Sequence, residues 1–165
     1  MANGSPQTAL EIVRLSPATR DGLLALLQAL EASGEAELFR PHPFTAEHLD
    51  AIGDPQSLDL YYVATAGGVV AGYGLLRGWE EGYTVPSLGI AVHPAWRGRG
   101  LAATLMHFLH GAARLRRSER VRLRVLDTNE RAIRLYRRSG YVFQEKTEVD
   151  ARGNRMLVGF KELGA

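Results

Sequence analysis

The first fifty residues carry both strand-like and helix-like hydrophobic patterns. Residues 10–15 alternate apolar and polar side chains as a strand does. Five leucines between 23 and 30 then predict a helix with a broad apolar face, which Ser33-Gly34 ends. Two prolines make 39–44 an irregular loop, and residues 45–52 predict a short helix capped by its leading threonine.

The middle of the chain changes to β-type patterns. Apolar, β-branched and aromatic residues dominate 58–65 and 69–77, and the Ala-Gly-Gly sequence at 66–68 is typical of a tight hairpin turn. Residues 87–92 form another apolar run that ends at a proline-containing segment. These runs predict an antiparallel meander.

The C-terminal part alternates helices with strands. Apolar residues recur at helical spacing over 101–117, a strand follows at 121–126, and 129–139 is helical with arginines on its polar side. A last hairpin is predicted from 141–149 and 155–160. The whole pattern predicts a mixed fold of the α/β (α+β) class.

Length and composition indicate one domain over residues 1–165, with 1–8 flexible. The chain has 45% hydrophobic residues, enough for one core, and its net charge of +2 does not require a nucleic-acid partner. It has no cysteine, which excludes disulfides and thiolate catalysis. It also has neither a membrane-length apolar run nor a secretory leader pattern, so we expect a cytoplasmic protein without membrane contact.

The stretch 92–102 joins a buried strand directly to an amphipathic helix and is rich in glycine and arginine. Backbone N–H groups at a helix N-terminus can hold phosphate oxygens when no side chain is in the way. Gly98, Gly100 and Ala102 leave the approach open, and two arginines add positive charge. The segment therefore predicts a pyrophosphate site.

The same segment also fits a dinucleotide-binding fingerprint, Gly98-x-Gly100-x-x-Ala103. A dinucleotide-binding domain would begin with this unit and continue with further parallel strand–helix units. Here a meander precedes the loop, and only about 60 residues follow it. The topology argues against this alternative.

Three segments together resemble the GNAT superfamily of acetyl-CoA-dependent N-acetyltransferases. Arg97-x-x-Gly100-x-Ala102 resembles its acetyl-CoA signature, Ile90 to Pro94 its preceding strand, and Asn129 to Tyr141 its second conserved block. The resemblance is strong over 87–145 and rests on element order over 10–86. It implies a GNAT fold with a mixed, mostly antiparallel central sheet of six to seven strands, flanked by helices and splayed at the central strands.

The resemblance implies acetyl-CoA as cosubstrate and no metal. It assigns the pantetheine arm to the backbone of the strand before the loop, the pyrophosphate to the loop amides, and the reaction's oxyanion to an amide near Val92. The resemblance also implies that Asn129 contacts CoA, although this residue could merely cap the following helix. The implied CoA-binding residues are Ile90, Ala91, Val92, Arg97, Gly98, Arg99, Gly100, Leu101, Ala102, Asn129 and Tyr136.

Tyr136 matches the tyrosine that the family often uses as a general acid toward the leaving CoA thiolate. A phenol can serve because its unperturbed pKa of about 10 keeps it protonated at neutral pH. The structural alternative is a core tyrosine on the apolar side of its helix.

An attacking amine must lose a proton, so a base is needed. Glu80 and Glu81 are the catalytic candidates, with His42 and His48 as further ones and Tyr83 as an orienting hydroxyl. Each could equally be a solvated carboxylate or a packing side chain.

Aromatic and histidine side chains are expected on the acceptor side. His42, Phe44, Trp79 and Tyr83, with Phe39, suit a small amine, such as an amino sugar or an amino-acid-like molecule, or a peptide terminus. The alternatives are a protein or peptide acetyltransferase and a CoA-binding sensor without catalysis. A homodimer is compatible with the resemblance.

A nucleic-acid-binding module is the remaining alternative, because arginines are frequent between 114 and 138. The periodicity spreads them over several directions, and aromatic residues for base stacking are nearly absent among them. We therefore expect no nucleic-acid partner.

Overall fold

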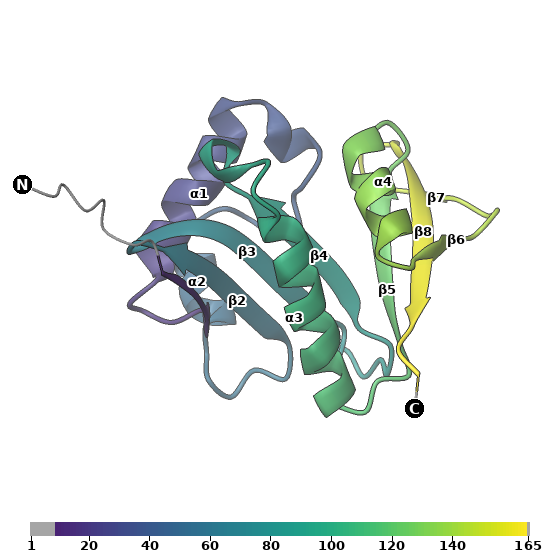
Figure 1. The fold of residues 1–165 in the computed structure, drawn as a ribbon, viewed down its shortest axis with the longest axis horizontal. Coiled ribbons are helices and arrows are strands. Elements are labelled where there is room, and N and C mark those ends of the chain that lie inside the picture. Colours follow the sequence, from purple (N-terminus) through teal and green to yellow (C-terminus); the bar gives the residue numbers. More distant parts are fainter. Residues whose placement is uncertain (1–8, 165) are drawn as a thin grey trace, which may run out of the picture.

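The computed structural model describes residues 9–164, so the predicted flexibility of 1–8 lies outside the described residues. Eight strands form one open sheet in the order β1-β2-β3-β4-β5-β8-β6, with β7 also paired to β8 (Figure 1). All pairs are antiparallel except β4 with β5. The strands are β1 (Leu10–Arg14), β2 (Leu60–Ala66), β3 (Val69–Arg77), β4 (Ser87–Val92), β5 (Arg120–Leu126), β6 (Val142–Phe143), β7 (Glu148–Val149) and β8 (Arg155–Glu162).

Helices cover both faces of the sheet. The helices are α1 (Arg20–Ala32), α2 (Ala46–Ile52), α3 (Leu101–Leu115) and α4 (Glu130–Arg138), with short 3-10 turns η1 (Glu35–Glu37) and η2 (Pro94–Trp96). The leucines of α1 and α2 pack with Tyr73 and Leu75 of β3 on one face. α3 and α4 pack with Leu76 and Leu88 on the other.

Two glycines let α3 approach the sheet closely. A Cβ atom at Gly72 would lie 2.8 Å from a methyl carbon of Leu105, and one at Gly74 would lie 3.0 Å from a methyl carbon of Leu109. Both leucines are fully buried. The packing of α3 fixes the position of its N-terminus at the end of β4, where the glycine-rich loop lies.

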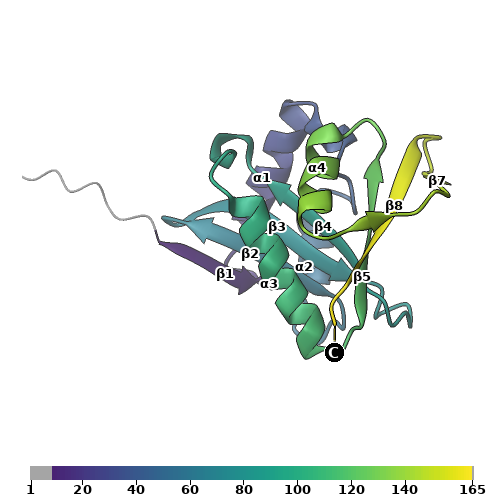
Figure 2. The ribbon, with the colours of Figure 1, turned by 45° about the vertical axis from the view of Figure 1, so that its right-hand side comes forward.

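The sheet opens between its two parallel strands. β4 and β5 pair only at Ser87 and Arg122, and beyond this point β5 pairs with β8 alone. Figures 1 and 2 show the resulting separation, with α4 and the paired strands β5 and β8 on one side and the β1–β4 meander on the other. The predicted splay of the central strands is confirmed.

The elements predicted from the sequence are present, with shifts of a few residues at their ends. The main difference is the strand predicted at 141–149, which is divided into β6 and β7, each of two residues. The intervening residues 144–147 are polar, and 144–146 are exposed, so continued pairing would bury no apolar surface there. This division accounts for eight strands where six to seven were predicted. Within residues 9–164, no helix has the length and apolar character needed to cross a bilayer.

Candidate active site

A cavity of about 840 Å³ occupies the opening between β4 and β5. Its walls come from η1 and the following loop, from β4, from the N-terminus of α3, from β5, from α4 and from the β7–β8 turn. It therefore joins the glycine-rich loop at one end to the closed end of the splay at the other. Such a concave site, built from many elements, is the expected form of a binding site for small molecules.

The glycine-rich loop presents open backbone toward this cavity. Gly98 and Gly100 have φ values of +74° and +80°, which L side chains rarely adopt, and a Cβ atom at either position would meet no atom within 4 Å. α3 begins after Gly100 without a side-chain cap, so the first amides of the helix are left for a ligand. Leu101 and Ala102 of this first turn line the cavity.

The arginines of the loop contribute less free charge than predicted. The guanidinium of Arg97 donates to both carboxylate oxygens of Glu35 and, at 3.3 Å, to the Val92 carbonyl oxygen. The Arg131 guanidinium lies 3.8 Å from Glu35, and hydrogen bonding from Arg97 lowers the pKa of this carboxyl. Arg99 is exposed, stacks on Trp96 at 4.8 Å, and is not among the residues that line the cavity.

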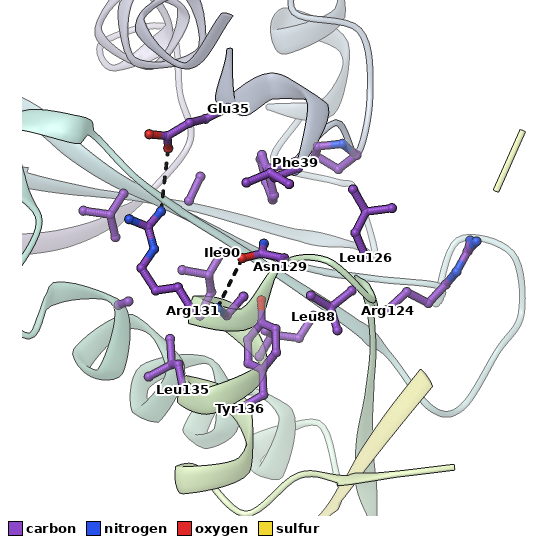
Figure 3. A pocket seen from close by; sticks show the side chains of 18 of the residues that line it. Glu35, Phe39, Leu88, Ile90, Arg124, Leu126, Asn129, Arg131, Leu135 and Tyr136 are labelled. Atoms are coloured by element: carbon purple, nitrogen blue, oxygen red, sulfur yellow. Dashed lines mark hydrogen bonds and ion pairs between the residues drawn. The ribbon is translucent and has the colours of Figure 1, made fainter. Parts of the chain in front are cut away.

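The other predicted CoA-contact residues face the cavity. Ile90, Ala91 and Val92 of β4 form one wall. Asn129 lines the cavity and also caps α4, because its Oδ1 accepts a hydrogen bond from the Ala132 amide at 3.3 Å (Figure 3). Capping leaves the side-chain NH₂ group of Asn129 available, so the two roles weighed for this residue are compatible.

Tyr136 projects from α4 into the same space. Its side chain is only 8% exposed, and no hydrogen bond to its hydroxyl is formed within residues 9–164. The hydroxyl is nevertheless not fully enclosed by protein atoms, and its accessible surface faces the cavity. Figure 3 shows it pointing toward Asn129 at the start of α4, with Leu88 and Ile90 of β4 beside it. Burial raises its pKa to about 12.

Sequence comparison assigns this architecture to a family. The profile of the acetyltransferase (GNAT) family matches residues 24–141. The chain belongs to the GNAT acetyltransferase family. This membership makes it an acetyl-CoA-dependent N-acetyltransferase. The chain is also 33% identical, over 127 residues, to a thialysine N-epsilon-acetyltransferase of Bos taurus, covering 74% of this chain and 67% of the relative.

Solved structures show the same fold at low sequence identity. An acetyltransferase structure from Salmonella typhimurium with acetyl-CoA matches with a TM-score of 0.77 and 18% identity, covering 95% of each chain. The PaiA N-acetyltransferase of Thermoplasma acidophilum in complex with coenzyme A has a TM-score of 0.73 and 16% identity, over 93% of this chain and 99% of the other. A GCN5-related N-acetyltransferase from Kribbella flavida has a TM-score of 0.75 and 22% identity, over 93% and 98%.

The two glutamates predicted as bases lie outside the cavity of this GNAT domain. Glu80 Oε1 accepts from the Leu58 amide at 2.5 Å and from the Ser57 hydroxyl at 3.2 Å, so this carboxylate fixes the loop before β2. Glu81 is exposed in the turn after β3. The turn folds back toward the start of β2, away from the splay.

His42 lies in the core and not in the cavity. Its Nδ1 is 2.8 Å from the Pro43 carbonyl oxygen and its Nε2 is 2.7 Å from the Tyr73 hydroxyl. A carbonyl only accepts, so Nδ1 carries the proton and Nε2 accepts from Tyr73. Burial lowers the pKa of His42 to about 4, which keeps the imidazole neutral. His48 stacks on His42 at 4.9 Å.

Most of the aromatic residues predicted for the acceptor side pack elsewhere. Phe44 packs against the core beneath α1 and under Arg40, and Trp79 packs against the other core and under Arg116. Tyr83 is 63% exposed and does not line the cavity. Phe39 does line it.

Sequence reasoning missed several polar residues that line the cavity. Arg77, Ser87, Arg122 and Arg124 line the cavity, and so does Asp150 of the β7–β8 turn. The alternation along β5 placed Arg122 and Arg124 on one face, but which face met a cavity could not be read from it. Within residues 9–164, no group of three His, Asp or Glu side chains is placed to hold a metal ion.

Proposed function

We propose that this enzyme transfers acetyl from acetyl-CoA to the primary amine of a small molecule by direct attack in a ternary complex. The observation that carries the proposal is the cavity between β4 and β5, which reaches from the glycine-rich loop past Tyr136 to the opposite face of the sheet. A cavity lined by residues from both faces of the sheet gives a long cosubstrate and an acceptor separate sides from which to meet.

The residues at the loop end fit coenzyme A. Free amides at the start of α3 suit the pyrophosphate, and the absence of Cβ atoms at Gly98 and Gly100 allows close approach. Ile90 to Val92 do not pair with β5, so the backbone groups of this segment that face the opening are available to an extended arm, apart from the Val92 carbonyl, which accepts from Arg97. Arg97 is already paired with Glu35, so we assign most of the phosphate binding to backbone N–H groups.

We assign Tyr136 the role of a hydrogen-bond donor to the departing sulfur. In the reaction a C–N bond forms and the C–S bond breaks. After the attack the nitrogen loses one proton, and this proton offsets the negative charge of the departing thiolate. The thiolate of a thiol with an ordinary pKa of about 8.5 is a weaker base than the phenolate of Tyr136, whose phenol has a pKa of about 12, so complete proton transfer from Tyr136 to the thiolate is uphill. Stabilising the developing thiolate through a hydrogen bond needs no complete transfer.

The amine's proton has no obvious acceptor among the carboxyl groups lining the cavity. Glu35 and Asp150 have lowered pKa values, from Arg97 and from the Asn154 backbone amide respectively. Glu37 is exposed and lies 3.7 Å from Arg152. We propose that the acceptor reacts after losing its proton to water, and that the arginines on the acceptor side disfavour the ammonium form.

The acceptor is proposed to be amino-acid-like rather than an amino sugar. The bovine relative is named for thialysine, an amino acid, and the cavity is lined by charged as well as apolar groups. A protein N-terminus is the second candidate, because the fold is shared with the ribosomal-protein-S18-alanine N-acetyltransferase of Escherichia coli at a TM-score of 0.73. The proposed cytoplasmic location and homodimer remain predictions.

The CoA assignment is tested by a matched pair of glycine variants. Gly100→Ala and Gly68→Ala each place a methyl group at a φ near +80°, with nothing within 4 Å, so each is expected to lower stability by about 1 kcal/mol. Only Gly100 lies in the phosphate loop, whereas Gly68 lies in the β2–β3 turn. Calorimetry should show weaker CoA binding for Gly100→Ala alone. Equal affinity for the two variants would contradict the assignment.

The acceptor is identified by acetyl-CoA-dependent thiol release. Amino acids, amino sugars and N-terminal peptides are compared at equal concentration, with product mass confirming N-acetylation. Turnover on free amino acids supports the proposal. Turnover confined to peptides favours the second candidate, and CoA binding without turnover on any amine would indicate a sensor.

A further inference from the structure

Two arginines and a serine lie in one row across the three central strands. Arg77 of β3 pairs in register with Ser87 of β4, and Ser87 pairs with Arg122 of β5. Directly paired residues of neighbouring strands project from the same face, so the three side chains lie side by side. All three line the cavity at the closed end of the splay.

This row carries more positive charge than its neighbours neutralise. Within residues 9–164, Arg77 forms no ion pair, and its Nη1 donates to the Pro41 carbonyl oxygen at 2.6 Å. Arg122 and Arg124 share one carboxylate, Glu148 of β7, at 2.6 Å and 3.0 Å. The two carboxylates near these guanidinium groups, Glu148 and Asp150, lie on the Arg122 and Arg124 side, and Arg77 forms an ion pair with neither.

The row is separate from the phosphate loop. Ser87 begins β4 and Val92 ends it, so five strand steps, or roughly 17 Å, separate the row from the start of the loop. The row projects from the face of the sheet that α1 and η1 cover. Arg77 is two residues after Leu75, which packs against α1, and Ser87 is two residues before Gly89, over which Phe39 of the loop after η1 lies. CoA phosphates held at the loop leave this charge uncompensated.

We infer that the acceptor carries a small anionic group in addition to its amine, and that Arg77 and Arg122, with the Ser87 hydroxyl, bind this group. The inference rests on the proposed function and narrows its substrate class. A guanidinium binds a carboxylate or phosphonate through parallel N–H···O bonds, which fixes orientation as well as position. The Pro41 carbonyl holds Arg77 in place before the ligand arrives. Polyamines and unmodified amino sugars lack the matching charge.

The test compares amines that differ only in the anionic group. Glycine, β-alanine, 4-aminobutyrate and lysine are each assayed against their carboxamides, and 2-aminoethylphosphonate tests the other anion. We expect kcat/KM at least tenfold higher for an acid than for its amide, with chain length reporting the distance between the row and the thioester. Better turnover of the carboxamides, or no difference, would overturn the inference.

Variants then locate the anion site. Arg77→Gln and Arg122→Gln should remove most of the preference for the acid over the amide while leaving CoA affinity unchanged. Arg120→Gln is the matched control, since Arg120 lies on the same strand, stacks on Phe160 and does not line the cavity. A loss that is equal for acid and amide, or equal in Arg120→Gln, contradicts the assignment.

A binding readout covers the case in which no amine of the panel is turned over. The same acids and amides, and their N-acetyl derivatives, are titrated into CoA-saturated enzyme by calorimetry. Binding of the acids that is lost in Arg77→Gln supports the inference even without turnover, and equal or absent binding of the acids overturns it. Failure of CoA itself to bind would instead contradict the proposed function, so the two failures are distinguishable.

Discussion

Replacing Tyr136 by phenylalanine should lower catalysis without lowering stability. The ring is buried in the core that α3 and α4 share, and phenylalanine keeps that packing. The hydroxyl forms no hydrogen bond within residues 9–164, so its removal breaks no native interaction there. We expect the free energy of unfolding to change by less than about 0.5 kcal/mol. Removing a donor aimed at developing charge typically costs about 100-fold to 1000-fold in kcat.

Tyr141 provides a matched control, because it is a buried tyrosine whose ring centroid is 5.9 Å from that of Tyr136. Its hydroxyl lies 2.8 Å from His110 Nε2, so Tyr141→Phe removes a buried hydrogen bond. The expected loss of stability is about 1 kcal/mol, with kcat nearly unchanged. The two variants should therefore show opposite patterns in urea unfolding and in thiol release.

Single-turnover rates should be measured beside kcat, because slow product release could hide a change in the chemical step. The wild-type rate should also show no loss from Tyr136 ionisation until the pH approaches about 12, since burial raises its pKa and only the protonated phenol can donate. The reasoning is refuted if Tyr136→Phe keeps single-turnover rates within threefold of wild type. It is also refuted if both variants lose stability and rate together.

Two further predictions concern charge. His42 and His110 have pKa values lowered by burial to about 4, so the stability linked to their neutral forms is present above pH 6.5 and is lost as the pH falls toward 4. Urea unfolding between pH 6.5 and 5 should show that the free energy of unfolding falls with decreasing pH, with a slope that approaches the uptake of two protons on unfolding. A slope near zero would contradict this. Glu35→Gln frees Arg97 and Arg131, so CoA should bind a few times more tightly and with steeper salt dependence in calorimetry. Unchanged affinity and slope would show that these guanidiniums do not face the phosphates.

Local signals in the sequence were sufficient to predict the backbone geometry of the glycine-rich loop. Gly98 and Gly100 adopt left-handed backbone conformations, and the helix start follows them directly, so the open amides of the loop depend on residues adjacent in the chain. Asn129 caps α4 for the same local reason. The order of strands and helices was also predictable, because each element's periodicity is contained within its own residues.

Only the tertiary structure decided which residues form the proposed acceptor side. Arg77, Ser87 and Arg122 come together through the register of three strands, and nothing near any one of them in the chain indicates the other two. Glu80 lies beside the start of β2 and His42 lies in the core, because long-range packing directs the side chains of turns and loops. Local sequence thus determined the backbone conformation of the proposed CoA-binding loop. Which side chains share the acceptor cavity was decided by pairing and packing between segments far apart in the chain.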